Sequence, residues 1–166
     1  EPLSSGRTRD AGGRSIFWHA VAREWSQVAL SILSRFPPQA GDTGVNVREV
    51  HPQRGDTLLH LLCGRQRFNP QAAELFSNLL VAVPESILLR RNSNGQSFFH
   101  NAAARLNSWV LSHSVSSRSA SARLVVEKDS AGWTPLALLA RHMQRRAPPP
   151  PAPAMPQAAG PKKDTS

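Results

Sequence analysis

The sequence predicts an all-α fold, an α-solenoid of three to four degenerate helical-pair repeats with disordered termini. Three observations support this prediction: apolar residues recur in short bursts with helical spacing, one glycine-led motif returns along the chain, and half of the prolines gather near the C-terminal end. Of the 166 residues, 40% are hydrophobic and one is cysteine. The single cysteine excludes a disulfide scaffold and a Cys-based zinc finger.

Composition divides the chain into three parts. Residues 1–14 are polar and lack periodicity, so we expect a flexible N-terminal segment. Residues 147–166 contain consecutive prolines, which lack N–H donors and favour polyproline II, so we expect a disordered tail or linker. Residues 15–146 are the predicted folded domain. Because the chain begins with Glu rather than Met, we also expect a processed product or a fragment of a longer protein.

Helical spacing runs through most of the folded part. The predicted helical stretches are Ile16–Leu33 with a polar break at Arg23–Gln27, Thr57–Cys63, Pro70–Val83, Ser97–Leu106, Ser108–His113 and Thr134–Met143. Pro70 suits the first turn of a helix, where its missing N–H costs nothing. No segment sustains a period of two, although Ser86–Arg91 and Arg123–Lys128 could be short extended stretches.

One motif occurs three times: GDTLLHLLC at 55–63, GQSFFHNAA at 95–103 and GWTPLALLA at 132–140. The glycines Gly55, Gly95 and Gly132 lie 40 and 37 residues apart, and a weaker fourth copy begins at Ser15. Glycine tolerates the positive φ of a tight turn. The hydroxyl residues after them can cap a helix, worth ~1 kcal/mol each, and the next residue of the last copy suits the first helical position; these are Thr57, Ser97, Thr134 and Pro135.

This motif resembles the ankyrin repeat, whose first helix opens with Gly-x-Thr-Pro-Leu-His-x-Ala-Ala. The resemblance covers about residues 15–143. It implies stacked helical pairs, with His60 and His100 forming structural hydrogen bonds between neighbouring repeats. It also implies a concave face and inter-repeat turns that bind another protein, with no catalysis and no cofactor.

The repeats depart from the family pattern in three respects. Leu58 and Phe98 replace the proline, and Ala137 replaces the histidine of the last copy. The spacings exceed the usual ~33 residues, so we expect enlarged loops around Asp42–Arg54 and Ser114–Arg123. A helical-pair solenoid of another kind is the structural alternative.

A basic edge is one candidate binding surface, because the chain carries a formal net charge of +9. Arginines fall in or beside the expected inter-repeat turns at Arg48, Arg54, Arg65, Arg67, Arg90 and Arg91. Guanidinium groups pair bidentately with carboxylates and phosphates, so the alternative function is binding of nucleic acid or another acidic polymer. The other interpretation is ordinary solvated surface.

Tryptophans and one histidine–cysteine pair are further candidates. Trp18 and Trp109 fall in apolar helical stretches and are predicted core residues, whereas Trp25 and Trp133 lie in turns where either could anchor a partner. His60 and Cys63 share a helix face, as two metal ligands would, but a closed zinc site needs four ligands. No metal site is therefore predicted.

The expected tail carries a short recognition pattern. Arg145, Pro148 and Pro151 provide a basic residue followed by Pro-x-x-Pro, the spacing that suits Src-homology-3 or WW domains on a polyproline II helix. A plain spacer to another domain is the alternative.

The sequence contains no nucleophile elbow, phosphate loop or His-Glu-x-x-His helix, so we expect a non-enzymatic, intracellular protein without a membrane span. In the repeat alignment Leu59, Phe99 and Leu136 should occupy equivalent buried positions. The last predicted helix has no following helix to cover it, so we expect an exposed apolar patch near Leu138 and Leu139.

Overall fold

The computed structural model describes residues 9–38, 44–64, 69–117 and 123–146, which are mostly helical. The helices are α1 (Ile16–Ala22), α2 (Ser26–Arg35), α3 (Leu58–Cys63), α4 (Pro70–Ala82), α5 (Glu85–Leu88), α6 (Phe98–Ala104), α7 (Ser108–Ser117) and α9 (Pro135–Arg146). Across these four ranges no strand forms, and extended pairing is limited to two isolated bridges, Arg9 with Ser15 and Val50 with Thr57. The prediction of an all-α fold is confirmed for these residues.

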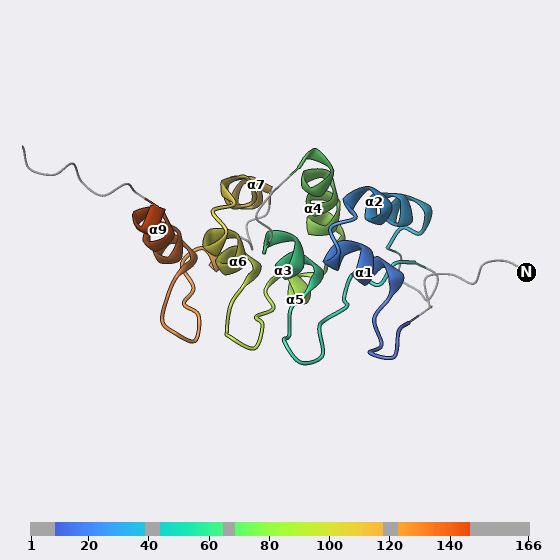
Figure 1. The fold of residues 1–166 in the computed structure, drawn as a ribbon, viewed down its shortest axis with the longest axis horizontal. Coiled ribbons are helices and arrows are strands. Elements are labelled where there is room, and N and C mark those ends of the chain that lie inside the picture. Colours follow the sequence, from blue (N-terminus) through green and yellow to red (C-terminus); the bar gives the residue numbers. More distant parts are fainter. Residues whose placement is uncertain (1–8, 39–43, 65–68, 118–122, 147–166) are drawn as a thin grey trace, which may run out of the picture.

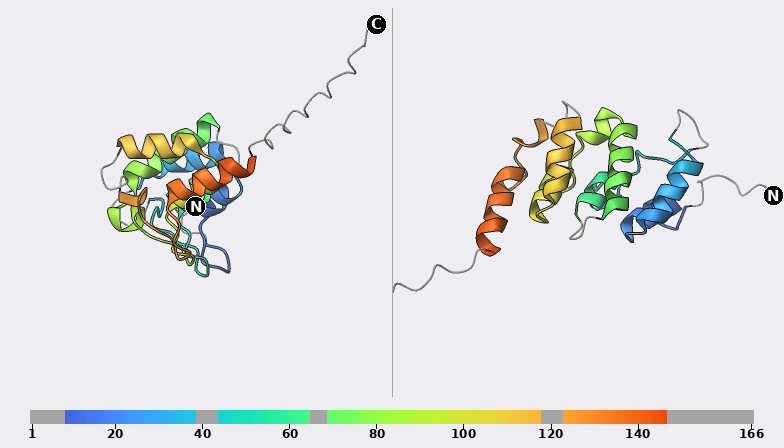
Figure 2. Two further views of the ribbon diagram at one scale, coloured as in Figure 1. Left: turned by 90° about the vertical axis from the view of Figure 1, so that its left-hand side faces the viewer. Right: turned by 90° about the horizontal axis from the view of Figure 1, so that it is seen from above.

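Apart from the short α5, the helices lie in two parallel rows (Figures 1 and 2). In the first row α1 contacts α3, α3 contacts α6, and α6 contacts α9; in the second row α2 contacts α4. Three of the four first-row helices also pack on the second-row helix that follows them, in the pairs α1–α2, α3–α4 and α6–α7. The resulting body is elongated, and the turns that precede the first-row helices all project from the same side.

A similar turn precedes each of the four first-row helices, and we call these turns fingers. Finger 1 is residues 10–14, finger 2 is 51–56, finger 3 is 92–96 and finger 4 is 129–133. A finger together with the helices that follow it is a unit. Units 1 to 3 contain the three helix pairs, and unit 4 contains α9.

Polar caps fix where the helices begin. Ser15 Oγ accepts the Trp18 N–H at 3.1 Å, and Asn69 Oδ1 accepts the Ala72 N–H at 2.7 Å. Thr134 Oγ1 accepts the Ala137 N–H at 3.2 Å. Such oxygens satisfy N–H groups that have no partner inside the helix, so α1, α4 and α9 each start directly after a capping residue. Three first-row helices therefore begin one residue after Thr57, Ser97 and Thr134.

The core runs along the junction between the two rows. Phe76 of α4 is fully buried and lies 6.0 Å, between ring centroids, from both Phe98 of α6 and Trp109 of α7. Ala102 and Ala103 are also fully buried, and their small side chains allow the neighbouring helices close approach. Trp18 is buried as expected, and Trp109 is half-buried against this core.

The last helix departs from the expected burial. Leu59 and Phe99 are fully buried, but Leu136 is 61% exposed, because no described helix follows α9 to cover that side. The exposed apolar patch is also placed differently. Leu138 is buried at 8% and Leu139 is half-buried, whereas Met143 is 60% exposed together with Leu136.

Two smaller expectations also change. The segment that could have been extended, Ser86–Arg91, overlaps the short helix α5, which is closed by a hydrogen bond from the Leu89 N–H to Glu85 O. The folded part begins before residue 15, because Asp10 to Arg14 form finger 1, which its own hydrogen bonds close. The structure therefore differs from the expected flexible segment over residues 10–14.

Candidate functional site

Each finger is closed by a backbone hydrogen bond from its first residue to its last. The N–H of Asp10 donates to Arg14 O at 2.9 Å, that of Asn92 to Gln96 O at 2.9 Å, and that of Asp129 to Trp133 O at 2.8 Å. Finger 2 is one residue longer, and the His51 N–H donates to Asp56 O at 2.8 Å. The four turns therefore share one closing bond.

The side chain of the first residue closes the same turn from within. Asp10, Asn92 and Asp129 each accept two backbone N–H groups on one oxygen, from the residues two and four positions later, at 2.8–3.0 Å. In finger 2, His51 Nδ1 accepts from Gln53 at 3.4 Å and from Arg54 at 3.2 Å. The backbone hydrogen bond from Arg14 is the main cause that lowers the pKa of Asp10 to about 2. The first position of the four fingers is therefore filled by three residue types, Asp, Asn and His, whose side chains all accept backbone hydrogen bonds within the turn.

Glycine is required in fingers 2 and 3 for two reasons. Gly55 and Gly95 both have φ of +68°, in the left-handed region that favours glycine. Each also lies against the next finger: a Cβ on Gly55 would lie 3.2 Å from the backbone of Asn92 and Ser93, and one on Gly95 would lie 2.9 Å from the Ser130 backbone nitrogen. The motif glycine therefore permits both the turn and the close packing of neighbouring fingers.

The two motif histidines connect successive units. The Thr57 N–H donates to His60 Nδ1 at 3.2 Å, and His60 Nε2 lies 2.8 Å from Gln96 O at the end of finger 3. In the next unit, the Ser97 N–H donates to His100 Nδ1 at 3.1 Å, and His100 Nε2 lies 3.0 Å from Trp133 O at the end of finger 4. Each ring therefore bonds its own helix start and the following finger.

These contacts fix the proton on each ring. A backbone N–H can only donate and a carbonyl oxygen can only accept, so Nδ1 is unprotonated and Nε2 carries the hydrogen. His60 and His100 are 1% and 0% exposed, and this burial is the main cause that lowers the pKa of both imidazoles. Both rings are consequently neutral at neutral pH and act in the fold as hydrogen-bonding groups.

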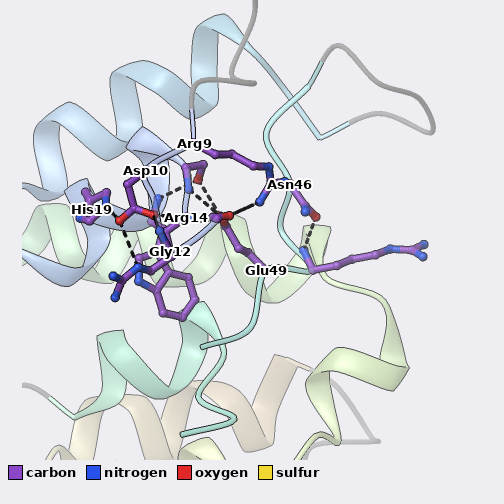
Figure 3. A network of polar contacts seen from close by, with 11 residues as sticks. Arg9, Asp10, Gly12, Arg14, His19, Asn46 and Glu49 are labelled. Carbon is purple, nitrogen blue, oxygen red and sulfur yellow. Dashed lines mark hydrogen bonds and ion pairs between the residues drawn. The ribbon is translucent and has the colours of Figure 1, made fainter. Parts of the chain in front are cut away.

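The junction between units 1 and 2 is built differently (Figure 3). The position equivalent to His60 is Trp18, whose ring lies 6.2 Å from that of His51. Glu49, which is only 6% exposed, instead accepts the Ser15 N–H at 2.8 Å and the Ser15 hydroxyl at 2.6 Å. It also pairs with Arg9 at 3.1 Å. A buried carboxylate thus replaces the histidine contact here.

The arginines predicted to form a basic edge have different surroundings. Arg48 and Arg90 are exposed. Arg54 pairs with Asp56 at 3.2 Å, and Arg91 pairs with Glu127 at 2.5 Å and donates to Lys128 O at 2.5 Å. Arg54 and Arg91 therefore contribute to the structure of the fingers as well as to the surface charge. Arg65 and Arg67 lie outside the described residues.

The other predicted binding residues lie in unit 1, in unit 4 or outside the described residues. Trp133 is 38% exposed, and the Arg141 guanidinium lies 5.0 Å from its ring centroid. Trp25 is 53% exposed, and Arg145 is exposed at the end of α9. Pro148 and Pro151 lie outside the described residues.

A pocket with a volume of about 400 Å³ opens where finger 2 meets the first-row helices. Its walls come from three successive units and include Arg54, Asp56, Gly64, Asn101, Arg105 and His142. Sequence reasoning did not single out Arg105 or His142. One signal in the sequence could have pointed to the pocket. Gly64 and Arg105 each directly follow the last residue of a first-row helix, so an alignment of the repeats places them at equivalent positions.

Two further features are absent from the described ranges. No group of three or more His, Cys, Asp or Glu side chains there could hold a metal ion. None of the helices in that part of the chain has both the length and the apolar character needed to cross a membrane.

Known proteins resemble this chain in structure. No family model matches the chain, and no curated protein matches it. Among solved structures, it is similar to a chain in the complex of the predatory endopeptidase Bd0816 from Bdellovibrio bacteriovorus with the immunity protein Bd3460. The TM-score is 0.62 and the identity 16%, over 85% of this chain and 64% of that chain. The likeness is one of fold.

Proposed function

We propose that this chain is an α-solenoid of ankyrin-like repeats that binds another protein without catalysis. The observation that carries the proposal is the pair of equivalent histidine bridges, from His60 to Gln96 O and from His100 to Trp133 O. They join a glycine turn and a capped helix to the next turn, as the ankyrin-like motif implies. The similar solved structure also belongs to a protein–protein complex.

The surface bounded by the fingers and the first-row helices is the proposed binding surface. Stacked repeats leave such a surface free, because each unit buries its apolar side on its neighbours. Finger tips such as Gln53 and Asn94 are exposed there. Val81 and Val28 are exposed on the second row and belong to the opposite side of the helix layer.

Site-specific photo-crosslinking tests this proposal. A photoreactive residue in place of Gln53 or Asn94 is expected to trap one protein from lysate of the source cells. The same residue in place of Val81 or Val28 is the matched control and should not trap it. Crosslinks from the second-row positions alone, or crosslinks to nucleic acid from the fingers, would contradict the proposal.

A further inference from the structure

We propose that the pocket between finger 2, α3, α6 and α9 accepts the side-chain carboxylate of an acidic segment in the partner protein. This inference rests on the proposed function and identifies the chemistry of the partner at one place on the surface. The pocket volume of about 400 Å³ lies within the range of ligand sites, roughly 300–1,000 Å³.

The charges that line the pocket favour an anion. Arg54 is paired with Asp56, whose second carboxylate oxygen accepts the Asn92 amide at 2.9 Å, so this carboxylate is satisfied and only 3% exposed. Arg105 is exposed, and among the described residues its guanidinium has no ion pair or hydrogen bond. The described part of the lining therefore keeps one unpaired positive charge.

Two helix ends at the pocket oppose an anion, but more weakly. Gly64 and Arg105 are the C-caps of α3 and α6, and a helix C-terminus carries up to about half a negative charge. Hydrogen bonds already occupy carbonyls at these ends, since His60 O accepts from Asn101 Nδ2 at 3.1 Å and Ala102 O accepts from the Asn107 N–H at 2.9 Å. A bidentate guanidinium–carboxylate pair at Arg105 is the stronger interaction.

The same lining argues for a carboxylate over a nucleic acid. Single-stranded nucleic acid is held by a groove of several basic residues and by aromatic rings that stack on the bases. Among the described residues, the pocket wall contains no Trp, Phe or Tyr. His60 borders the pocket, but both of its ring nitrogens are already used by the fold. One unpaired guanidinium in a recess matches a single carboxylate.

Peptide binding with charge-matched variants tests the inference. The probe is a fluorescent ten-residue peptide of alternating Ser and Glu, acetylated and amidated so that only side chains carry carboxylates. We expect it to bind at least tenfold more tightly than the Ser–Gln counterpart. Arg105→Gln should weaken binding about tenfold, and Arg105→Lys less. Arg35→Gln, which removes the same charge from the exposed end of α2 in the second row, should weaken it less than twofold.

Amide chemical shifts locate the bound peptide. The largest changes are expected at Gly64, Asn101 and Arg105. Equal weakening by Arg105→Gln and Arg35→Gln, equal binding of the Ser–Gln peptide, or tighter binding of a ten-nucleotide single-stranded DNA that Arg105→Gln weakens would each overturn the inference. If the finger crosslinks succeed while the Ser–Glu peptide fails, the proposed protein binding stands and the carboxylate pocket does not.

Discussion

The central junctions of this molecule and its N-terminal junction solve the same packing problem with different chemistry. Between units 2 and 3, and again between units 3 and 4, a buried neutral histidine bonds its own helix start and the next finger. Between units 1 and 2, Trp18 occupies that position and Glu49 bonds the helix start instead. One geometry is therefore compatible with a neutral ring in one place and a buried carboxylate in another.

The difference explains why one junction is easy to recognise in the sequence and the other is hard. A histidine three residues after a capping Ser or Thr lies within the motif itself. Glu49 lies 34 residues from Ser15, so no local pattern connects them. Such a junction becomes visible only when the turns are placed side by side.

The largest expected effect is on the free energy of unfolding, and it contrasts buried Leu59 of α3 with Leu136, the exposed residue at the equivalent position of α9. Leu59 is fully buried, so Leu59→Ala should lower the free energy of unfolding by about 2–5 kcal/mol. Leu136 is 61% exposed, so Leu136→Ala should change it by no more than about 0.5 kcal/mol. Urea unfolding followed by circular dichroism measures both. A similar loss in the two variants would show that something covers α9 in solution.

The next effect removes one histidine bridge. His100→Ala leaves the buried Ser97 N–H without its acceptor and removes one of the two hydrogen bonds to Trp133 O, so it should destabilise the protein by about 1–3 kcal/mol. His100→Gln keeps a side-chain acceptor at the capping position, so it should lose less. Thermal and urea unfolding give the comparison. An unchanged midpoint for His100→Ala would mean that the bridge contributes nothing to stability.

A third prediction uses pH to separate the two kinds of junction. The pKa of His60 and of His100 is lowered in the folded protein from the ordinary value of 6.5, so the unfolded chain takes up protons first as the pH falls. Their contribution to stability should be full above pH 6.5 and decrease below it, by at most about 1.4 kcal/mol per pH unit for each ring.

Urea unfolding between pH 7.5 and 5.5 measures this slope. The variant with both His60→Gln and His100→Gln should show a shallower slope, because neither ring remains to titrate. Asp10 and Asp129 do not interfere in this range, since their pKa values lie below the ordinary 3.8. An unchanged slope in the double variant would assign the pH dependence to other groups.

Much of the fold follows from short-range chemistry, which explains why it could be predicted. Gly55, Thr57 and His60 lie within six residues, and each has a local role in a turn, a cap or a capping box. The pocket could not be predicted in the same way, because Arg54, Arg105 and His142 come from three units. The exposure of Leu136 also depends on what lies beside α9 and not on its own helical pattern.

Finger 1 was missed because its first residue is followed by no recognisable motif histidine. Asp10 nevertheless corresponds to Asn92 and Asp129, and Gly13 has φ of +76° like the other finger glycines. An Asp or Asn three residues before a glycine, and five before Ser or Thr, is the signal that marks three of the four turns.

The smallest expected effect tests whether the closure of finger 1 needs the negative charge of Asp10 or only its hydrogen-bond acceptor oxygen. Asp10→Asn keeps the oxygen that accepts the Gly12 and Arg14 N–H groups, as Asn92 does in finger 3, so finger 1 should remain closed. Asp10→Ala removes the acceptor and should open the turn, which we expect to detect as faster amide hydrogen exchange at Gly12 and Arg14.

The wild-type carboxylate has a pKa of about 2, below the ordinary 3.8, so its contribution should be present above pH 3.8 and be lost as the pH falls toward 2. Asp10→Asn should remove that acid transition while preserving protection at neutral pH. Loss of protection in Asp10→Asn equal to that in Asp10→Ala would show that finger 1 depends on the negative charge, for instance through the contact of Asp10 with His19 at 2.8 Å, and would set it apart from finger 3.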